Sequence, residues 1–518
     1  MARSKRFLSA VLLTYTYQAL LMLVGLWLTP FLLKRIGQHD YGVWIIALQV
    51  LAYLSLVDIG VVILLPREIA YATGRAGGST DSSELPFIFG RTLRIIFYQM
   101  PLVVMAAAGF WFWFPVPANV HGFIGLIIAA FTLLFPLRVF RATVEGLQDL
   151  KFMGQVTILT WVAGTVVMVA LIFAGVGLYA MAIGWAATQF LNAAIFAYRI
   201  VSRYPHVLPS KRAHFSSAGA AEYFKRGMWA SVSQIATPLM SGFDILVIGK
   251  VLGAAAVVPY TCTGKLISVL SNQPQALLDA ALPGLSEVKA GESKDHVFRV
   301  TTALTQASLM IAGAVACTVV AVNQGFVTWW VGSRLYGGLL LSLLIAVAML
   351  LRQWNVTLVY SMFCYGLEKR LSLMSLLDGV TTATTAAVLI SWLGPIGGPL
   401  ASVFSILVVC LPANLSAVAR QAGVSVPGLL RPLWPWGWRV VTLGVAACLL
   451  GRQWTPHGFL QTAATGVLAG ITYVAVMLTI GKKSVLWPYV QPRVQPIHDV
   501  LVARLGLVKT ATADLVNK

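Results

Sequence analysis

The sequence predicts an all-α protein that crosses a membrane many times. Of its 518 residues, 58% are hydrophobic and only 10% are charged, and the mean hydropathy is +0.82. A soluble protein of ordinary composition carries about 25% charged residues, so this chain has too little polar surface for a water-facing globule. Apolar runs long enough to span about 30 Å of hydrocarbon recur along its whole length.

Fourteen segments are long and apolar enough to be predicted as membrane-spanning helices. They cover approximately residues 10–33, 41–65, 87–114, 122–145, 153–176, 178–200, 228–250, 255–280, 300–323, 338–366, 371–393, 396–419, 439–453 and 459–480. The thirteenth is short for a full crossing. Pro136 lies inside the fourth segment and can kink that helix, because proline removes a backbone donor.

Polar connections divide the chain into five predicted parts. These are an N-terminal six-helix bundle (1–200), a basic cytoplasmic linker (201–227), a second six-helix bundle (228–420), two additional spans (421–480) and a basic cytoplasmic tail (481–518). The linker is the longest polar connection. Three prolines and three tryptophans between residues 421 and 439 set the last two spans apart.

The positive charge is distributed unevenly around the predicted spans. The net charge is +20, and most Lys and Arg residues flank the spans on the side that also carries Arg3, Lys5 and Arg6. Cytoplasmic loops of membrane proteins are enriched in Lys and Arg, so both termini are predicted to be cytoplasmic. The anionic inner leaflet accounts for the basic balance, and no nucleic-acid partner is expected.

A weak internal repeat relates the two predicted bundles. Gly37, Tyr41 and Trp44 recur as Gly253, Val257 and Tyr260, at a constant offset of 216 residues. Parallel repeats occur in transporters, whose substrate sites lie at the repeat interface.

Three local patterns carry a resemblance to a known family. They are Gly37-x-x-x-Tyr41-Gly42-x-Trp44, Asp58-Ile59-Gly60 and Arg67-Glu68-Ile69-Ala70, and the run Phe243–Gly249 before Leu252-Gly253 adds to them. The chain resembles bacterial O-antigen-type polysaccharide flippases of the multidrug/oligosaccharidyl-lipid/polysaccharide exporter superfamily. The resemblance implies two six-helix bundles around a central cavity that opens to one side at a time. It also implies export of an isoprenoid-pyrophosphate-linked oligosaccharide from the inner to the outer leaflet of a bacterial cytoplasmic membrane. Membrane lipids and other polysaccharide-assembly membrane proteins are the further expected partners.

Four cationic side chains are candidates for binding an acidic headgroup: Arg352, Lys265, Arg138 and Arg141. An ionised residue near the middle of a membrane costs about 2.5–3.5 kcal/mol, so it marks a functional site by default. Arg352 and Lys265 lie deep in their predicted spans. Arg138 and Arg141 share one helical face, and arginine binds a pyrophosphate bidentately.

Structural interpretations compete with each of these assignments. Lys265 and Arg352 can form ion pairs with Asp244 and Asp378, and Arg138 and Arg141 can be ordinary cytoplasmic flanks. Asp58 and Asp244 can couple transport to a proton or sodium ion. As structural groups, these two acids can instead pair with Lys265 or cap a broken helix.

No metal or cofactor is expected. No His pair has the spacing of a metal site, and all five cysteines lie in apolar segments without a CxxC pattern, as small buried hydrophobic residues do. Two alternative functions stay open: a multidrug cation antiporter of the same superfamily, and a membrane-embedded saccharide polymerase or ligase. The deep cations disfavour the first, and the absence of a carboxylate pair or histidine in the longest outer loop disfavours the second.

Overall fold

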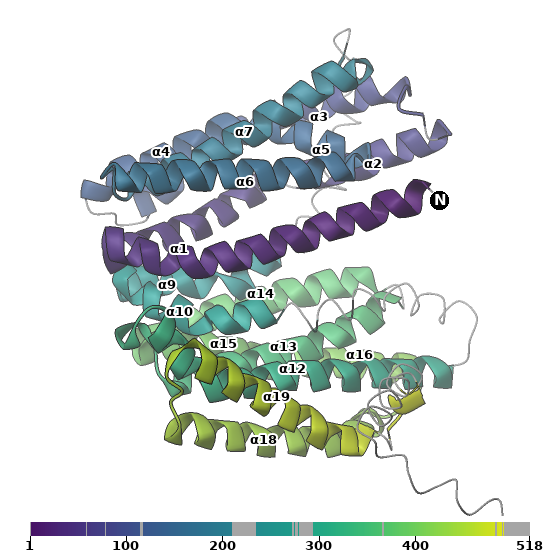
Figure 1. Cartoon of the computed structure of the whole chain (residues 1–518). Helices are drawn as coiled ribbons and strands as arrows, with labels where there is room; N and C mark the ends of the chain where they lie inside the picture. Colours follow the sequence, from purple (N-terminus) through teal and green to yellow (C-terminus); the bar gives the residue numbers. More distant parts are fainter. Residues whose placement is uncertain are drawn as a thin grey trace, which may run out of the picture. The chain divides into compact units, whose positions relative to one another are not determined.

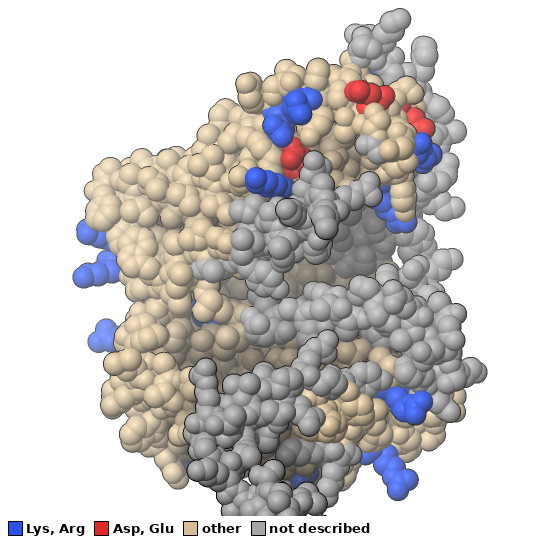
Figure 2. Space-filling model, turned by 45° about the vertical axis from the view of Figure 1, so that its right-hand side comes forward, with Lys and Arg blue, Asp and Glu red and all other residues tan. Residues whose placement is uncertain are grey.

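The computed structural model describes residues 2–58, 60–77, 79–113, 118–209, 235–271, 274, 278, 294–364, 367–481, 484–488 and 491. All regular structure in these residues is helical, as predicted for an all-α protein. Most of the predicted linker (201–227) and of the predicted tail (481–518) lies outside the described residues. On the face in Figure 2, the described residues are mostly uncharged, with Lys and Arg in small separate groups.

Long helices dominate the chain (Figure 1). They are α1 (Ala2–Leu54), α2 (Val61–Arg75), α3 (Glu84–Trp113), α4 (Ala118–Leu134), α5 (Arg138–Gly146), α6 (Leu150–Phe173), α7 (Tyr179–Arg203), α9 (Phe243–Val251), α10 (Ala254–Leu270), α12 (Lys294–Trp330), α13 (Leu339–Cys364), α14 (Glu368–Leu393), α15 (Gly397–Ser405), α16 (Leu411–Ala422), α17 (Val426–Leu430), α18 (Trp434–Gln453) and α19 (Gly458–Gly481). Short helical turns join some of them: η1 (Ser55–Asp58), η2 (Phe135–Leu137), η3 (Pro205–Val207), η4 (Ser333–Leu335), η5 (Gly394–Ile396), η6 (Ile406–Cys410) and η7 (Arg431–Leu433).

Ten helical stretches in the described residues are long and apolar enough to cross a membrane, so the chain is a multi-pass membrane protein. Two of them, Thr16–Asp58 and Arg370–Ala422, have a glycine with positive φ in their interior, Gly37 in the first and Gly394 in the second. A single stretch can therefore hold more than one predicted span. The total of fourteen crossings stays a prediction.

Helix α1 is a hairpin of two helices that turns at Gly37. Gly37 has φ 86° and ψ 168°, a conformation that only glycine adopts without strain. The hydroxyls of Thr29 and Tyr41 lie 3.2 Å apart, whereas twelve residues of straight helix would separate them by about 18 Å. The chain therefore folds back on itself between these two residues.

The repeat-related glycine, Gly253, has nearly the same φ as Gly37. Its φ is 89°, and it ends the α9 segment just before α10 begins. Gln38 Nε2 donates a hydrogen bond of 2.8 Å to the backbone oxygen of Ala255, and Gly42 packs directly against the Ala254 carbonyl. The two turns that match in sequence thus contact one another.

The predicted span 41–65 is not one continuous helix. It tightens into the 3₁₀ turn η1 at Ser55, passes through Gly60 with φ 70°, and restarts as α2 at Val61. The backbone N–H of Gly60 donates a 2.8 Å hydrogen bond to Asp58 Oδ1, which satisfies a donor that the break would otherwise leave unpaired. Asp58 is thus placed by a helix break rather than by a regular helix.

The chain divides into two compact units. The first comprises Met1–Thr263, Val327–Gly337 and Ser372–Ser405, and the second comprises Gly264–Phe326, Gly338–Leu371 and Ile406–Lys518. Each has its own apolar core, with Ile69, Phe89 and Phe123 in the first and Val319, Trp436 and Met477 in the second. The five predicted parts of the chain and their boundaries stay predictions.

Candidate functional site

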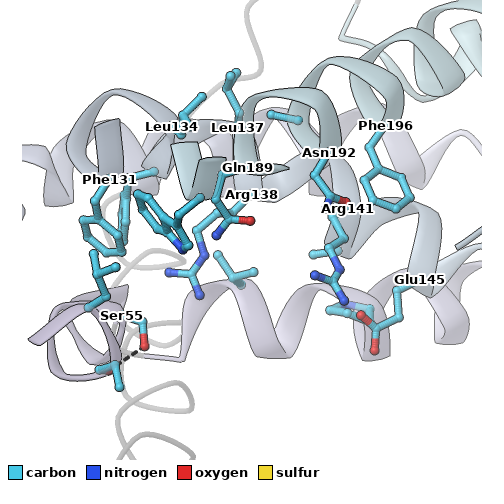
Figure 3. A pocket seen from close by; sticks show the side chains of 18 of the residues that line it. Ser55, Phe131, Leu134, Leu137, Arg138, Arg141, Glu145, Gln189, Asn192 and Phe196 are labelled. Carbon is cyan, nitrogen blue, oxygen red and sulfur yellow. Dashed lines mark hydrogen bonds between the residues drawn. The ribbon is translucent and has the colours of Figure 1, made fainter. Parts of the chain in front are cut away.

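A charged cavity lies within the first unit. It has a volume of about 720 Å³, and its walls come from α1, η1, α2, α4, η2, α5 and α7. Charged residues on its wall are Arg67, Arg138, Arg141 and Glu145, and polar ones are Ser55, Gln189 and Asn192. Figure 3 shows that Arg138, Arg141 and Glu145 reach into this space from one helix, α5. The other wall residues are apolar, apart from the indole N–H of Trp185.

Helix α5 positions these charges because of how it begins and what it packs against. Pro136 lies in the 3₁₀ turn η2, which separates α4 from α5, as its place in the sequence predicted. Val139, Thr143 and Val144 are fully buried on one side of α5. Gly146 touches α2, where a Cβ would lie only 2.7 Å from Ile69 Cβ. This close approach leaves the charged side of α5 facing the cavity.

Arg138 and Asp58 form an ion pair at the cavity wall. Nη1 of Arg138 lies 3.5 Å from Oδ2 of Asp58, whose side chain is only 4% exposed. Within the described residues, Arg138 Nη1 is buried and makes no hydrogen bond. Gln99 Nε2 donates to the backbone oxygen of Asp58 at 3.0 Å and holds the break in place. Arg138 therefore already has a counter-charge, and its Nη1 group can still donate a hydrogen bond to a ligand.

Arg141 differs from Arg138 in that it forms no ion pair with Asp58. Its side chain is exposed to the cavity and forms no ion pair or hydrogen bond with a described residue. Glu145 lies one turn further along α5 and points into the same space (Figure 3). The pair Arg138 and Arg141 therefore presents two guanidinium groups to one cavity, of which one is already partly neutralised.

Arg67, Gln189 and Asn192 are among the polar residues of this cavity that were not predicted as site residues. Arg67 Nε donates to Tyr71 Oη at 3.0 Å, and Asn192 Nδ2 donates to Thr160 Oγ1 at 2.9 Å. Gln189 is exposed to the cavity. The sequence does hold a signal for Gln189 and Asn192, because these two amides lie three residues apart inside an apolar span. Polar groups within a membrane cost free energy and so mark candidate site residues.

Asp244 lies in the first turn of α9 and is held by hydrogen bonds. Its carboxylate accepts from the hydroxyl of Tyr260 on α10 and from its neighbour's backbone N–H at 2.9 Å. Gly398 on α15 packs beside it, where a Cβ would lie 3.1 Å from Asp244 Cβ. Asp378, on α14, accepts a 2.7 Å hydrogen bond from Ser405 Oγ. Both acids thus link helices of the first unit.

Lys265 and Arg352 belong to the second unit. Both side chains are half-buried. Arg352 lies in the middle of α13, next to Gln353 and near Asn355, which accepts a 2.7 Å hydrogen bond from Asn414 on α16. Arg352 therefore lies in a polar stretch of an otherwise apolar helix. In the described residues, no three His, Cys, Asp or Glu side chains are grouped so as to hold a metal ion.

Sequence comparisons show similarity to proteins of polysaccharide biosynthesis. A family model described as "Polysaccharide biosynthesis protein" matches residues 118–337. A putative O-antigen transporter of Shigella flexneri is 25% identical over 273 residues, which is 50% of this chain and 62% of that protein. The match thus spans less than two thirds of the relative's length.

Structural comparisons show the fold. Lipid II flippase MurJ, in an inward closed conformation, has a TM-score of 0.67 at 11% identity, covering 92% of this chain and 98% of that one. The MATE multidrug transporter DinF-BH has a TM-score of 0.51 at 14% identity, covering 82% and 96%. An outward-facing multidrug resistance MATE transporter of the MOP superfamily has a TM-score of 0.50 at 12% identity, covering 81% and 94%. The predicted transporter fold is confirmed.

Proposed function

We propose that this chain is a polysaccharide flippase of the exporter superfamily, which moves an isoprenoid-pyrophosphate-linked oligosaccharide from the inner to the outer leaflet by alternating access. The observation that carries the proposal is the placing of Arg138 and Arg141 on one wall of a cavity within a membrane-spanning bundle. A neutral or cationic cargo gives no reason for two guanidinium groups there, because each cation costs free energy on insertion.

The chemistry of the cavity suits a pyrophosphate with sugars attached. Arginine donates two parallel hydrogen bonds to phosphate oxygens, and such charge-assisted bonds are stronger than neutral ones. Gln189 and Asn192 offer amide groups to sugar hydroxyls, and Trp185 offers an apolar face to a sugar ring. Asp58 partly neutralises Arg138 in the empty cavity, which favours insertion and folding.

Other predicted residues keep their proposed roles. Arg352 and Lys265 are further candidate ligands of the headgroup in the second unit, and Asp58 and Asp244 are the candidate groups for ion coupling. The chain would act in a bacterial cytoplasmic membrane with both termini in the cytoplasm, together with other membrane proteins of polysaccharide assembly. The Lys and Arg bias of the loops supports this orientation.

Flipping of a fluorescent lipid-linked oligosaccharide in proteoliposomes tests the proposal. A charge-assisted hydrogen bond contributes about 1.5–3 kcal/mol, so Arg141→Gln should lower the initial rate at least about tenfold. Arg420→Gln, at the exposed end of α16, is the matched control and should leave the rate unchanged. A wild-type initial rate of flipping in each of the two single variants, Arg138→Gln and Arg141→Gln, would overturn the proposal. Export of a cationic dye instead of the oligosaccharide would favour the multidrug antiporter.

A further inference from the structure

A second, apolar cavity adjoins the charged one. It has a volume of about 930 Å³ and lies between α3 and α4, with Phe190 of α7 at its edge. Thr132 is the only polar residue among those that line it. Its walls include side chains that project away from the protein: Leu133 is 76% exposed, Phe190 60% and Phe97 58%. We call this space the α3–α4 groove.

The groove borders the charged cavity at η2 and extends along α3 as far as Trp111. Leu134 and Leu137, at and beside η2, line both spaces. At the other end, the Trp111 ring lies 5.4 Å from the His121 ring and packs against Gly125, where a Cβ would be 3.4 Å away. From Phe97 to Trp111, α3 rises by about 21 Å. It is therefore an elongated, open apolar groove along the membrane-spanning part of α3.

The turn η2 presents two different faces to the two spaces. In Figure 3 the side chains of Leu134 and Leu137 point away from the guanidinium of Arg138. Arg138 follows Leu137 directly in the chain, so a cationic group and an apolar wall adjoin within a few residues. A ligand with an anionic head and a long apolar tail matches this arrangement, with its head at Arg138 and Arg141.

We propose that the α3–α4 groove holds the isoprenoid chain of a polyprenyl pyrophosphate whose headgroup occupies the adjoining charged cavity. The inference rests on the proposed function. It also follows from steric necessity, because a head bound inside the bundle requires its tail to leave between helices. Burial from water does not drive the contact, since the tail is surrounded by lipid in either case. The groove instead fits the shape of the isoprenoid chain, so its contribution to binding depends on the length of that chain.

Photolabelling locates the tail. Purified full-length protein in nanodiscs is labelled with undecaprenyl pyrophosphate that carries a diazirine on its chain, and labelled peptides are mapped by mass spectrometry. Labels should concentrate on residues 97–111 and 128–137, and excess unlabelled undecaprenyl pyrophosphate should remove them while excess phosphatidylglycerol does not. The assignment of the isoprenoid chain to the groove would be overturned if labels spread evenly over all lipid-facing helices. It would also be overturned if excess phosphatidylglycerol removed the labels.

Groove-filling variants test the same assignment by a second route. Ala108→Trp and Ala129→Trp introduce an indole into the groove at exposed positions, and Ala170→Trp places one on an exposed position of α6 as the control. The first two should lower labelling by the long-chain probe at least about fivefold by excluding the chain from its volume. Their binding of geranyl pyrophosphate, a short-chain competitor, should match wild type. Unchanged long-chain labelling in both groove variants would overturn the inference.

The arginine variants separate the two proposals. Arg141→Gln should weaken binding of both the long-chain and the short-chain pyrophosphate. If Arg141→Gln has this effect while labels map away from the groove, only the groove assignment fails. If wild-type protein binds neither pyrophosphate, the proposed function fails, and the groove assignment fails with it.

Discussion

Arg138 and Asp58 are brought together at the wall of the charged cavity, with Nη1 of the arginine 3.5 Å from Oδ2 of the carboxylate. Sequence analysis considered Lys265 as a structural partner of Asp58, so this ion pair was not foreseen. Its other suggestion, that Asp58 caps a broken helix, agrees with the hydrogen bond from Gly60. A substrate pyrophosphate that binds Arg138 therefore competes with the Asp58 carboxylate for its guanidinium group.

The ion pair predicts a coupled effect on stability. Arg138→Gln should lower the free energy of unfolding by about 1–2 kcal/mol, because it leaves the buried Asp58 carboxylate without its counter-charge, and the partial exposure of Arg138 limits the loss. Adding Asp58→Asn should restore most of the stability but not transport. Melting temperatures in detergent and flipping rates measure the two effects. Strictly additive losses of stability would show that the pair is not coupled.

The helix break predicts different outcomes for two substitutions of Asp58. Asparagine keeps an oxygen that accepts from the Gly60 N–H, whereas alanine leaves that donor unsatisfied. Asp58→Ala should therefore be less stable than Asp58→Asn by about 1 kcal/mol. Thermal unfolding in detergent measures the difference, with Asp40→Asn at an exposed turn as the control. Equal melting temperatures for the two Asp58 variants would contradict the capping role.

The close contact between α2 and α5 predicts intolerance at Gly146. A methyl group there would lie 2.7 Å from Ile69 Cβ, so Gly146→Ala should destabilise the protein by about 1–3 kcal/mol. Gly109→Ala in α3 is the matched control, because no atom lies within 4 Å of its added Cβ. Removing a helical glycine should leave stability equal or higher there. Equal melting temperatures for wild type and Gly146→Ala would contradict the packing argument.

The bond from Tyr260 to Asp244 predicts a structural cost that can be separated from ion coupling. Tyr260→Phe removes a donor to a half-buried carboxylate and should cost about 1–3 kcal/mol of stability. Tyr198→Phe, on an exposed residue of α7, should cost nothing. If Asp244 couples transport to an ion, Asp244→Asn should remove the dependence of flipping on that ion's gradient. An unaltered gradient dependence would leave Asp244 with its structural role.

The depth of Arg352 in its helix predicts an effect of its replacement on surface polysaccharide in cells. Arg352→Ala should abolish surface polysaccharide without lowering the protein level, because a cation about 21 Å along α13 from Gly338 is too deep to reach either membrane surface. Arg334→Ala, at an exposed turn, is the control with the same change of charge. Polysaccharide gels and immunoblots of the membrane fraction provide the two measurements. Normal polysaccharide output in the Arg352 variant would count against its proposed role.

Much of the architecture was predictable from local patterns. The apolar runs identified the helices, and Pro136 marked the separation of α4 from α5. The motifs around Gly37 and Asp58 carried the resemblance to polysaccharide flippases. The i, i+3 spacing of Arg138 and Arg141 placed them on one face. Helix breaks at Asp58–Gly60 were harder to predict, because the run from Tyr41 to Leu65 stays apolar across the break.

By itself, the sequence determined that this chain is an all-α, multi-pass membrane protein, since composition and helical period depend only on residues close together in the chain. Only the tertiary structure decided which residues contact each charged side chain in the cavity. Asp58 meets Arg138, and Gln189 and Asn192 join Arg141 in one cavity, because packing brings together segments that are far apart in sequence. Charge pairing and cavity formation are properties of that packing, and no local pattern of residues specifies them.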